Sequence, residues 1–118
     1  MAWIGVALAG GLGAVLRFVV DGWIARRFGR ELPFGTFTIN VSGAFLLGLL
    51  DGLALTGTAM AVAGTAALGA YTTFSTWMFE TQRLAEDGEF SAAATNVVAG
   101  IIAGFLAVLL GHSIGRQL

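Results

Sequence analysis

The sequence predicts an all-α membrane protein with four transmembrane helices in each subunit. Of its 118 residues, 57% are hydrophobic and only 11% are charged, which is unlike the composition of a water-soluble domain. The mean hydropathy is +0.85. A membrane-spanning helix needs about 20 mainly apolar residues, so the chain has room for at most about four or five spans. We therefore expect one integral membrane domain over residues 1–118.

Charged and reactive side chains are scarce. The chain has six basic residues, all Arg, and seven Asp and Glu residues. The resulting net charge of -1 argues against a nucleic-acid partner. The chain has no Cys and a single His, His112. This excludes disulfides, thiolate catalysis, Cys-type zinc sites and the usual His-based acid–base pairs. We expect the protein not to be an enzyme.

Polar segments divide the chain into four apolar stretches. These stretches cover residues 2–28, 33–55, 57–83 and 90–116. Pro33 is the only proline, and a proline favours the first turn of a helix, so it opens the second stretch. An even number of spans places both termini on one side of the membrane. Each stretch is long enough to cross a bilayer as a helix.

Pairs of glycines recur four residues apart within the stretches. The pairs are Gly48 with Gly52, Gly100 with Gly104, and Gly111 with Gly115. Small residues at this spacing let helix backbones approach closely, and we expect ordinary helix packing from them. Four such helices barely enclose a path, so we expect an oligomer with any pore between or along its subunits.

Arginines are distributed unevenly between the two predicted sides. The first and third loops hold Arg26, Arg27, Arg30 and Arg83, whereas the other side holds Arg116. Positively charged loops tend to stay in the cytoplasm, so this bias places the first and third loops there.

Two groups of polar residues lie within the first and second spans. Arg17 and Asp21 are four residues apart, and we favour a self-neutralising pair over the rim of an ion entrance. Thr36, Asn40 and Gly43 share one face of the second helix. An interhelical hydrogen bond from Asn40 and a donor in a polar track are both open interpretations, because a buried amide needs a partner.

The third span contains an unusual segment at residues 69–77 (GAYTTFSTW). Its hydroxyl and β-branched residues make a poor helix centre, which predicts a break there. Backbone freed at bilayer depth is tolerated only inside protein or along a cavity, and free carbonyls bind alkali cations. The alternative is that the hydroxyls bond back to their own helix. Phe74 and Trp77 are three residues apart, and their ring edges are able to stabilise an anion, although packing is their commoner role.

Several motifs together resemble the CrcB/Fluc family of fluoride channels over nearly the whole chain. They are residues 10–14 (GGLGA) with Arg17, residues 33–36 (PFGT), residues 40–43 (NVSG), and residues 72–76 (TTFST) with Glu80. The resemblance implies an antiparallel dimer of four-helix subunits with two fluoride pathways. It also implies a structural sodium ion at the dimer interface, held by the backbone carbonyls of Gly69 and Thr72 from both subunits.

The resemblance assigns further residues to the fluoride pathway. It makes Asn40 the pore asparagine, Phe74 the first pathway aromatic and Arg17 a vestibule residue. It places the Thr36, Ser75 and Thr76 hydroxyls and Asn96 near the path. The chain departs from the family pattern at three positions, which are Trp77 in place of phenylalanine, Ala70 in place of glycine, and Gly100 where a hydroxyl is common.

The function implied is passive export of fluoride from the bacterial cytoplasm across the plasma membrane. We expect a homodimer, with a heterodimer formed with a second homologue as the alternative, since the arginine bias disfavours insertion in both orientations. No phosphate-binding loop motif occurs, so coupling to nucleotide hydrolysis is not expected. The rival function is a small multidrug-type exporter of organic cations, which requires a carboxylate within the membrane to couple protons.

Overall fold

A computed structural model describes residues 2–118, and helices are the only regular secondary structure in this part of the chain. Its elements are α1 (Ala2–Phe28), α2 (Phe34–Gly52), α3 (Gly57–Met60), the π-helix η1 (Ala61–Leu68), α4 (Gly69–Tyr71), α5 (Phe74–Glu86) and α6 (Phe90–Gln117). Because α3, η1 and α4 follow one another without a gap and point toward α5, the chain forms four rod-like segments. The predicted all-α class with four helical segments is confirmed.

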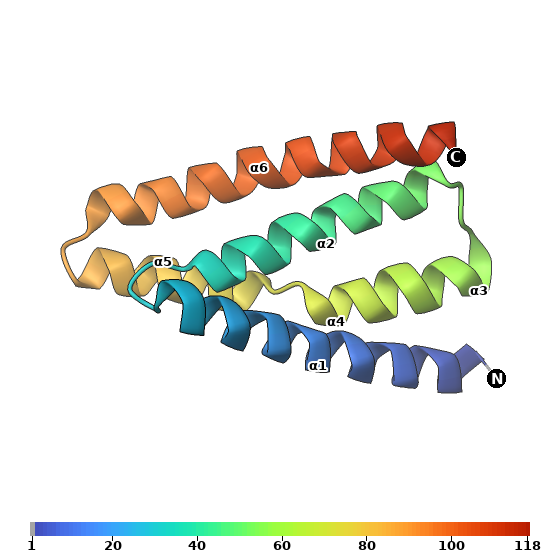
Figure 1. Cartoon of the computed structure of the whole chain (residues 1–118), viewed down its shortest axis with the longest axis horizontal. Coiled ribbons are helices and arrows are strands. Elements are labelled where there is room, and N and C mark those ends of the chain that lie inside the picture. Colours follow the sequence, from blue (N-terminus) through green and yellow to red (C-terminus); the bar gives the residue numbers. More distant parts are fainter. Residues whose placement is uncertain (1) are drawn as a thin grey trace.

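The four segments run side by side along the long axis of the molecule (Figure 1). The structure measures 48 × 29 × 22 Å, and its longest dimension is close to the ~40–45 Å thickness of a bilayer with its headgroups. The start of α1 and the end of α6 lie at the same end of the bundle. This agrees with the even number of segments read from the sequence.

Within the described residues 2–118, three helices are long and apolar enough to cross a membrane, namely α1, α2 and α6. Most of their large apolar side chains face outward, and Phe18 and Phe105 are 81% and 64% exposed. Such a surface is unsuited to water but normal against lipid or another subunit. The third segment is divided between η1, α4 and α5, so no single helix in it has the required length.

Glycines bring α2 and α6 into close contact. A Cβ on Gly48 would collide with the Val108 carbonyl, and a Cβ on Gly111 would collide with the Phe45 carbonyl. The predicted packing role is thus confirmed for the pairs Gly48 with Gly52 and Gly111 with Gly115. It does not hold for Gly104, beside which nothing lies within 4 Å of an added Cβ.

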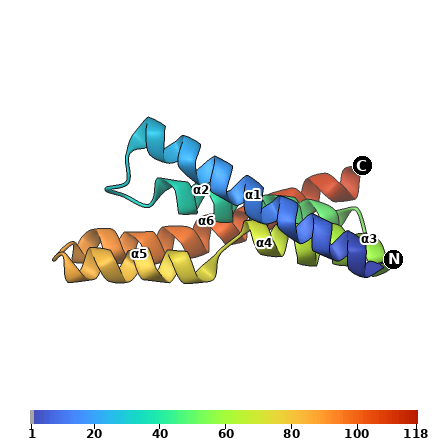
Figure 2. The same cartoon turned by 90° about the horizontal axis from the view of Figure 1, so that it is seen from below.

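Helix α1 packs against η1 and α4, with Gly13 lying directly on the backbone carbonyl of Ala67. Viewed from below, the second half of α1 turns away from α5, which instead lies along α6 (Figure 2). The chain reverses after α1 at Gly29, whose φ of 79° is in the left-handed region. Pro33 precedes the first residue of α2, one position earlier than a proline inside the first turn.

Candidate functional site

The helical path of the third segment stops between Tyr71 and Phe74. Thr72 (ψ 161°) and Thr73 (φ -150°) are both extended. The Thr73 hydroxyl then caps α5, because its Oγ1 accepts a hydrogen bond of 3.2 Å from the amide of Thr76. A threonine side chain at this position replaces one missing helical bond, which stabilises the start of the new helix. The sequence itself therefore supplies the signal that restarts the helix.

Asn40 of α2 holds the extended backbone from the side. Its Nδ2 donates to the Thr73 carbonyl and its Oδ1 accepts from the Thr73 amide, both at 2.8 Å. The side chain thus pairs with Thr73 much as a neighbouring strand would. A carboxamide has two N–H donors, so one donor of Asn40 remains after this pairing. Asn40 both fixes the interruption and keeps a neutral donor beside it.

These contacts leave two backbone carbonyls, those of Gly69 and Thr72, without their helical donors. A continued helix would pair the Gly69 carbonyl with the Thr73 amide and the Thr72 carbonyl with the Thr76 amide. The Thr73 amide instead bonds to Asn40, and the Thr76 amide bonds to the Thr73 hydroxyl. Gly69 is exposed and Thr72 is half-buried. Carbonyls without helical donors are suitable ligands for an alkali cation.

Arg17 of α1 reaches this segment and does not pair with Asp21. Its Nη1 makes a long hydrogen bond of 3.5 Å to the Thr72 carbonyl, while Asp21 forms an ion pair of 3.2 Å with Arg30. The predicted Arg17–Asp21 pair is therefore wrong. The reason is the reversal at Gly29, which brings Arg30 back toward the end of α1. The guanidinium of Arg17 instead places positive charge near the interruption.

Phe74 and Trp77 lie edge to face at the start of α5. Their ring centroids are 5.8 Å apart and the ring planes make an angle of 79°. Phe74 is 70% exposed, so its ring projects from the subunit, whereas Trp77 is half-buried. The positive edge of an aromatic ring offers weak attraction to an anion. This pair presents such edges beside Asn40.

Trp77 is also bonded to α6. Its indole Nε1 donates to the backbone carbonyl of Asn96 at 3.1 Å. The Asn96 Nδ2 donates to the Thr81 hydroxyl at 2.8 Å, and that hydroxyl donates to the Trp77 carbonyl at 2.8 Å. Asn96 is buried at 8% exposure. The three residues form a closed network that joins α5 to α6.

The remaining predicted hydroxyl residues differ in their surroundings. Thr36 is buried at 2% exposure, one turn before Asn40 on α2. Ser75 and Thr76 are exposed in the first turn of α5, and the Thr76 Oγ1 accepts a bond of 3.2 Å from Thr73. The Ser75 hydroxyl lies 3.5 Å from the Thr73 hydroxyl, so the structure brings both Ser75 and Thr76 to the interruption.

Two hollows meet the interruption. A small cavity of about 50 Å³ is lined by Phe37, Asn40, Val41, Trp77 and Gly100. An open groove of about 550 Å³ extends from Asn40 and Phe74 past Gly69 toward η1. A cavity of this smaller size has space for a water-sized species. Asn40 and Trp77 line both hollows.

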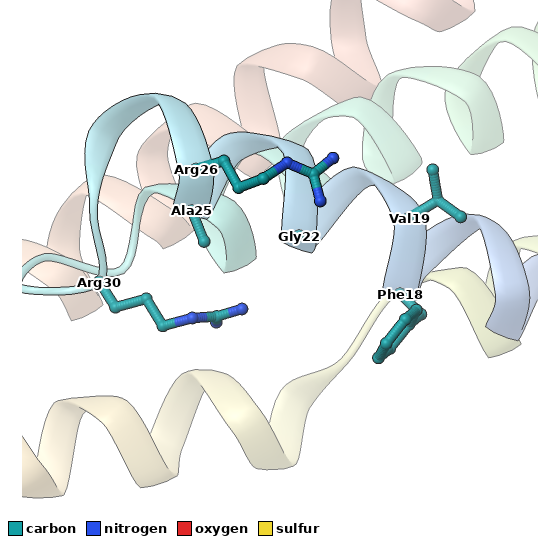
Figure 3. Close-up of a pocket in the computed structure, with 6 residues that line it drawn as sticks. All are labelled: Phe18, Val19, Gly22, Ala25, Arg26 and Arg30. Carbon is teal, nitrogen blue, oxygen red and sulfur yellow. The ribbon is translucent and has the colours of Figure 1, made fainter.

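A third pocket of about 450 Å³ lies along the second half of α1 and holds none of the predicted site residues. Figure 3 shows its lining, with Arg26 and Arg30 near one end and Phe18 near the other. Arg30 already pairs with Asp21. Within residues 2–118 no group of three or more His, Asp or Glu is placed to hold a metal ion.

Three residues of the site were not singled out as site residues from the sequence. Thr73 caps α5 and pairs with Asn40, and a threonine three residues before Thr76 is a recognisable helix-start signal. The Tyr71 hydroxyl lies 2.9 Å from the Ser42 hydroxyl, which ties α4 to α2. Thr81 joins the network of Trp77. The contact of Tyr71 with Ser42 depends on helix packing and has no local sequence signal, whereas Thr81 donates to a carbonyl four residues earlier on its own helix, a local pattern of threonine.

Glu80 lies two turns into α5 with one carboxylate oxygen enclosed. Its Oε1 is buried and has no hydrogen-bond partner among the residues that the structure describes. A buried carboxylate oxygen without a partner is costly, which makes this side chain a second polar feature of α5.

Comparison with known proteins places the chain in one family. A family model described as "CrcB-like protein, Camphor Resistance (CrcB)" matches residues 4–112. The chain is 55% identical over 114 residues to "Fluoride-specific ion channel FluC 2" of Mycolicibacterium paratuberculosis, covering 97% of this chain and 93% of that protein. It is 42% identical over 123 residues to "Fluoride-specific ion channel FluC" of Acidobacterium capsulatum, covering 100% and 98%.

A third relative is "Fluoride-specific ion channel FluC 1" of Symbiobacterium thermophilum, 40% identical over 121 residues that cover 98% of each protein. All three relatives carry the names of channels and not of enzymes. Together with the three apolar helices, these matches identify a multi-pass bacterial membrane protein. The family expected from the sequence motifs is confirmed, and the chain belongs to the CrcB-like proteins.

Proposed function

We propose that this chain is a fluoride-specific channel that lets fluoride leave the cytoplasm passively. The observation that carries the proposal is the paired contact of Asn40 with Thr73, which fixes an interrupted helix and leaves one neutral N–H donor beside it. The names of the relatives, each a fluoride-specific ion channel, support the choice of ion. Fluoride that enters as neutral HF and dissociates inside is the expected substrate.

Weak neutral donors suit the passage of fluoride. Fluoride holds its water tightly, so a path must replace that water with other donors without trapping the ion. The amide of Asn40 and the ring edge of Trp77 provide such donors at the small cavity, and Phe74 provides a further ring edge in the open groove beside it. The hydroxyls of Thr36, Ser75 and Thr76 and the amide of Asn96 extend this polar lining in our proposal.

Arg17 has a different role in this proposal. Its guanidinium lies beside the Thr72 carbonyl and not in the small cavity. A fixed positive charge next to the path attracts an anion toward it, whereas one inside the path would bind the anion too firmly to release it. Arg17 therefore serves to gather fluoride before it meets Asn40.

We further propose a structural sodium ion near the interruption. The carbonyls of Gly69 and Thr72 fit this role, because their usual helical donors are diverted to other partners. One subunit supplies two oxygens, so a second subunit related by a twofold axis would supply two more. Bound there, the ion would coordinate these carbonyls and add positive potential at mid-membrane.

The functional unit is an antiparallel dimer in this proposal. Phe74 projects from the subunit, and the open groove beside it is lined by site residues on both sides of the interruption. A second copy packed there would enclose both. A heterodimer is the alternative, because arginines are distributed unevenly between the two sides of the membrane. Two relatives carry the numbered names FluC 2 and FluC 1, which gives a further reason to test for a second homologue.

A proton-coupled exporter of organic cations is the second candidate. Such a protein needs a carboxylate within the membrane. Asp21 is bonded to Arg30 near the end of α1, but the buried Oε1 of Glu80 is a feature that fits this function. The two candidates differ in the ion that moves and in the need for protons.

Ion release from vesicles separates these candidates. The purified chain is reconstituted in liposomes loaded with equal fluoride and chloride, and a potassium ionophore balances charge. We expect fluoride to leave while chloride stays, at equal pH on both sides and without ATP. Release that requires a pH gradient and carries an organic cation would support the exporter instead. Fluoride release by this chain alone supports the homodimer. If this chain alone releases no fluoride and a second homologue restores release, the result supports the heterodimer.

A further inference from the structure

The Trp77 side chain packs directly against Gly100 of α6. A Cβ added at Gly100 would lie 2.7 Å from the indole Cζ2, 2.9 Å from Cε2 and 3.0 Å from Nε1. Carbon atoms in proteins do not approach so closely, so any larger residue would force the indole to move. The absence of a side chain at Gly100 therefore decides where this ring lies.

The same helix fixes the indole in orientation. Asn96 lies one turn before Gly100, and its backbone carbonyl accepts the indole N–H at 3.1 Å. The Asn96 side chain bonds to Thr81, and Thr81 bonds back to the Trp77 carbonyl. The ring is thus held at its nitrogen by one contact and against the helix backbone by another. Its strongest donor is used inside the subunit.

The position of the indole sets the shape of the small cavity. Trp77 and Gly100 line this 50 Å³ space together with Asn40, and the indole also packs against Phe74. Because the indole N–H points to Asn96, it is not offered to an anion in the cavity. The cavity then holds one amide donor and weak ring edges, a combination suited to rapid release.

We propose that Trp77 and Gly100 form a size-matched pair that sets the width of the ion path at Asn40. Gly100 acts as a positioning residue, because it touches the indole and has no side chain to touch the ion. Trp77 is the specificity-determining partner, since its bulk narrows the cavity that the glycine leaves. This inference rests on the proposed channel function for its transport readout, but the fit of the pair itself does not.

The first test is a double-mutant cycle on fluoride efflux from vesicles. Gly100→Ala pushes the indole toward Asn40, and we expect fluoride efflux to fall about tenfold or more. In a Trp77→Phe background the smaller ring leaves room for the new methyl group. There, Gly100→Ala is expected to change efflux by no more than about twofold. Gly104→Ala is the matched control, because nothing lies within 4 Å of its Cβ.

The second test follows the indole directly. The chain has three tryptophans, so Trp3→Phe and Trp23→Phe leave Trp77 as the only one. Gly100→Ala is expected to shift its fluorescence emission and raise its mobility in purified protein, whereas Gly104→Ala leaves both unchanged. This readout does not depend on ion transport.

The outcomes separate the pair from the proposed function. A parent protein that passes no fluoride but shows the Gly100→Ala fluorescence shift would refute the channel and keep the pair. Unchanged efflux and fluorescence in Gly100→Ala would overturn the inference while leaving the channel intact. An equal loss of efflux from Gly100→Ala in the parent protein and in the Trp77→Phe background would also overturn it, since the loss would then not act through the indole.

Discussion

Replacing Asn40 tests whether its amide belongs to the ion path or only supports the backbone. Asn40→Ala removes both 2.8 Å bonds to Thr73. Thr73 is only 8% exposed, and each backbone group left without a partner there costs about 1–3 kcal/mol. If even about 1.4 kcal/mol of this cost raises the transport barrier, fluoride efflux falls about tenfold.

Asn40→Asp separates the two roles, because the side chains have nearly the same shape. The carboxylate still accepts the Thr73 amide bond, so a purely supporting role predicts that Asn40→Asp is milder than Asn40→Ala. A role in the path predicts the opposite. A negative charge about 4 Å from fluoride raises its energy by about 4 kcal/mol at an effective dielectric constant of about 20, which lowers efflux about a thousandfold.

The assay is fluoride efflux from vesicles at pH 8, well above the ordinary Asp pKa of about 3.9. Ser42→Ala serves as the control on the same helix, since it removes the contact of the Ser42 hydroxyl with Tyr71 but no bond to Thr73. We expect Asn40→Asp to be slower than Asn40→Ala, and Ser42→Ala to retain most of its efflux. Faster efflux through Asn40→Asp than through Asn40→Ala would refute the path role.

Three further substitutions test the other parts of the site and the fold. Phe74→Ile removes the exposed ring edge, and fluoride efflux is expected to fall strongly while the oligomeric state in size-exclusion chromatography stays the same. Efflux equal to that of the parent protein would show that Phe74 is not part of the path. Thr72→Ala is expected to leave efflux nearly unchanged, because the hydroxyl donates only to the Leu68 carbonyl at 2.9 Å; a large loss would implicate the hydroxyl instead of the backbone carbonyl. Gly111→Ala places a methyl group on the Phe45 carbonyl and is expected to lower the free energy of unfolding by about 1–3 kcal/mol. Equal melting temperatures of this variant and the parent protein in thermal unfolding would contradict the packing of α2 on α6.

The helical framework follows from patterns that are local in the sequence. Runs of apolar residues define the four segments, and polar residues mark their ends close to where the structure places them. The third segment is interrupted within the hydroxyl-rich residues 69–77, at Thr72 and Thr73. The spacing of Gly48, Gly52, Gly111 and Gly115 also predicts close helix packing, because a four-residue step repeats on one helix face.

Contacts between distant segments were harder to predict. Arg17 and Asp21 have the spacing of a helical ion pair, yet the turn at Gly29 brings Arg30 to Asp21 instead. Helical spacing states which residues share a face, but it says nothing about a competing partner from a loop. The same limit applies to Asn40, whose two interpretations were balanced until its bonds to Thr73 were located.

Gly100 illustrates a different limit. From the sequence it is a position that lacks a hydroxyl, and its pairing with Trp77 depends on how α5 lies on α6. Size matching between two residues on different helices has no periodic signature. Only the relative placement of the helices relates the large residue to the small one.

The most direct measurement of the central claim is the reversal potential of currents through the purified chain in a planar bilayer. With a tenfold fluoride gradient and equal chloride and pH on both sides, a passive fluoride channel reverses at about 59 mV in magnitude, with the sign set by the fluoride gradient. We predict that value, unchanged when chloride is varied. A reversal potential near zero, or one that follows a proton gradient, would contradict the account.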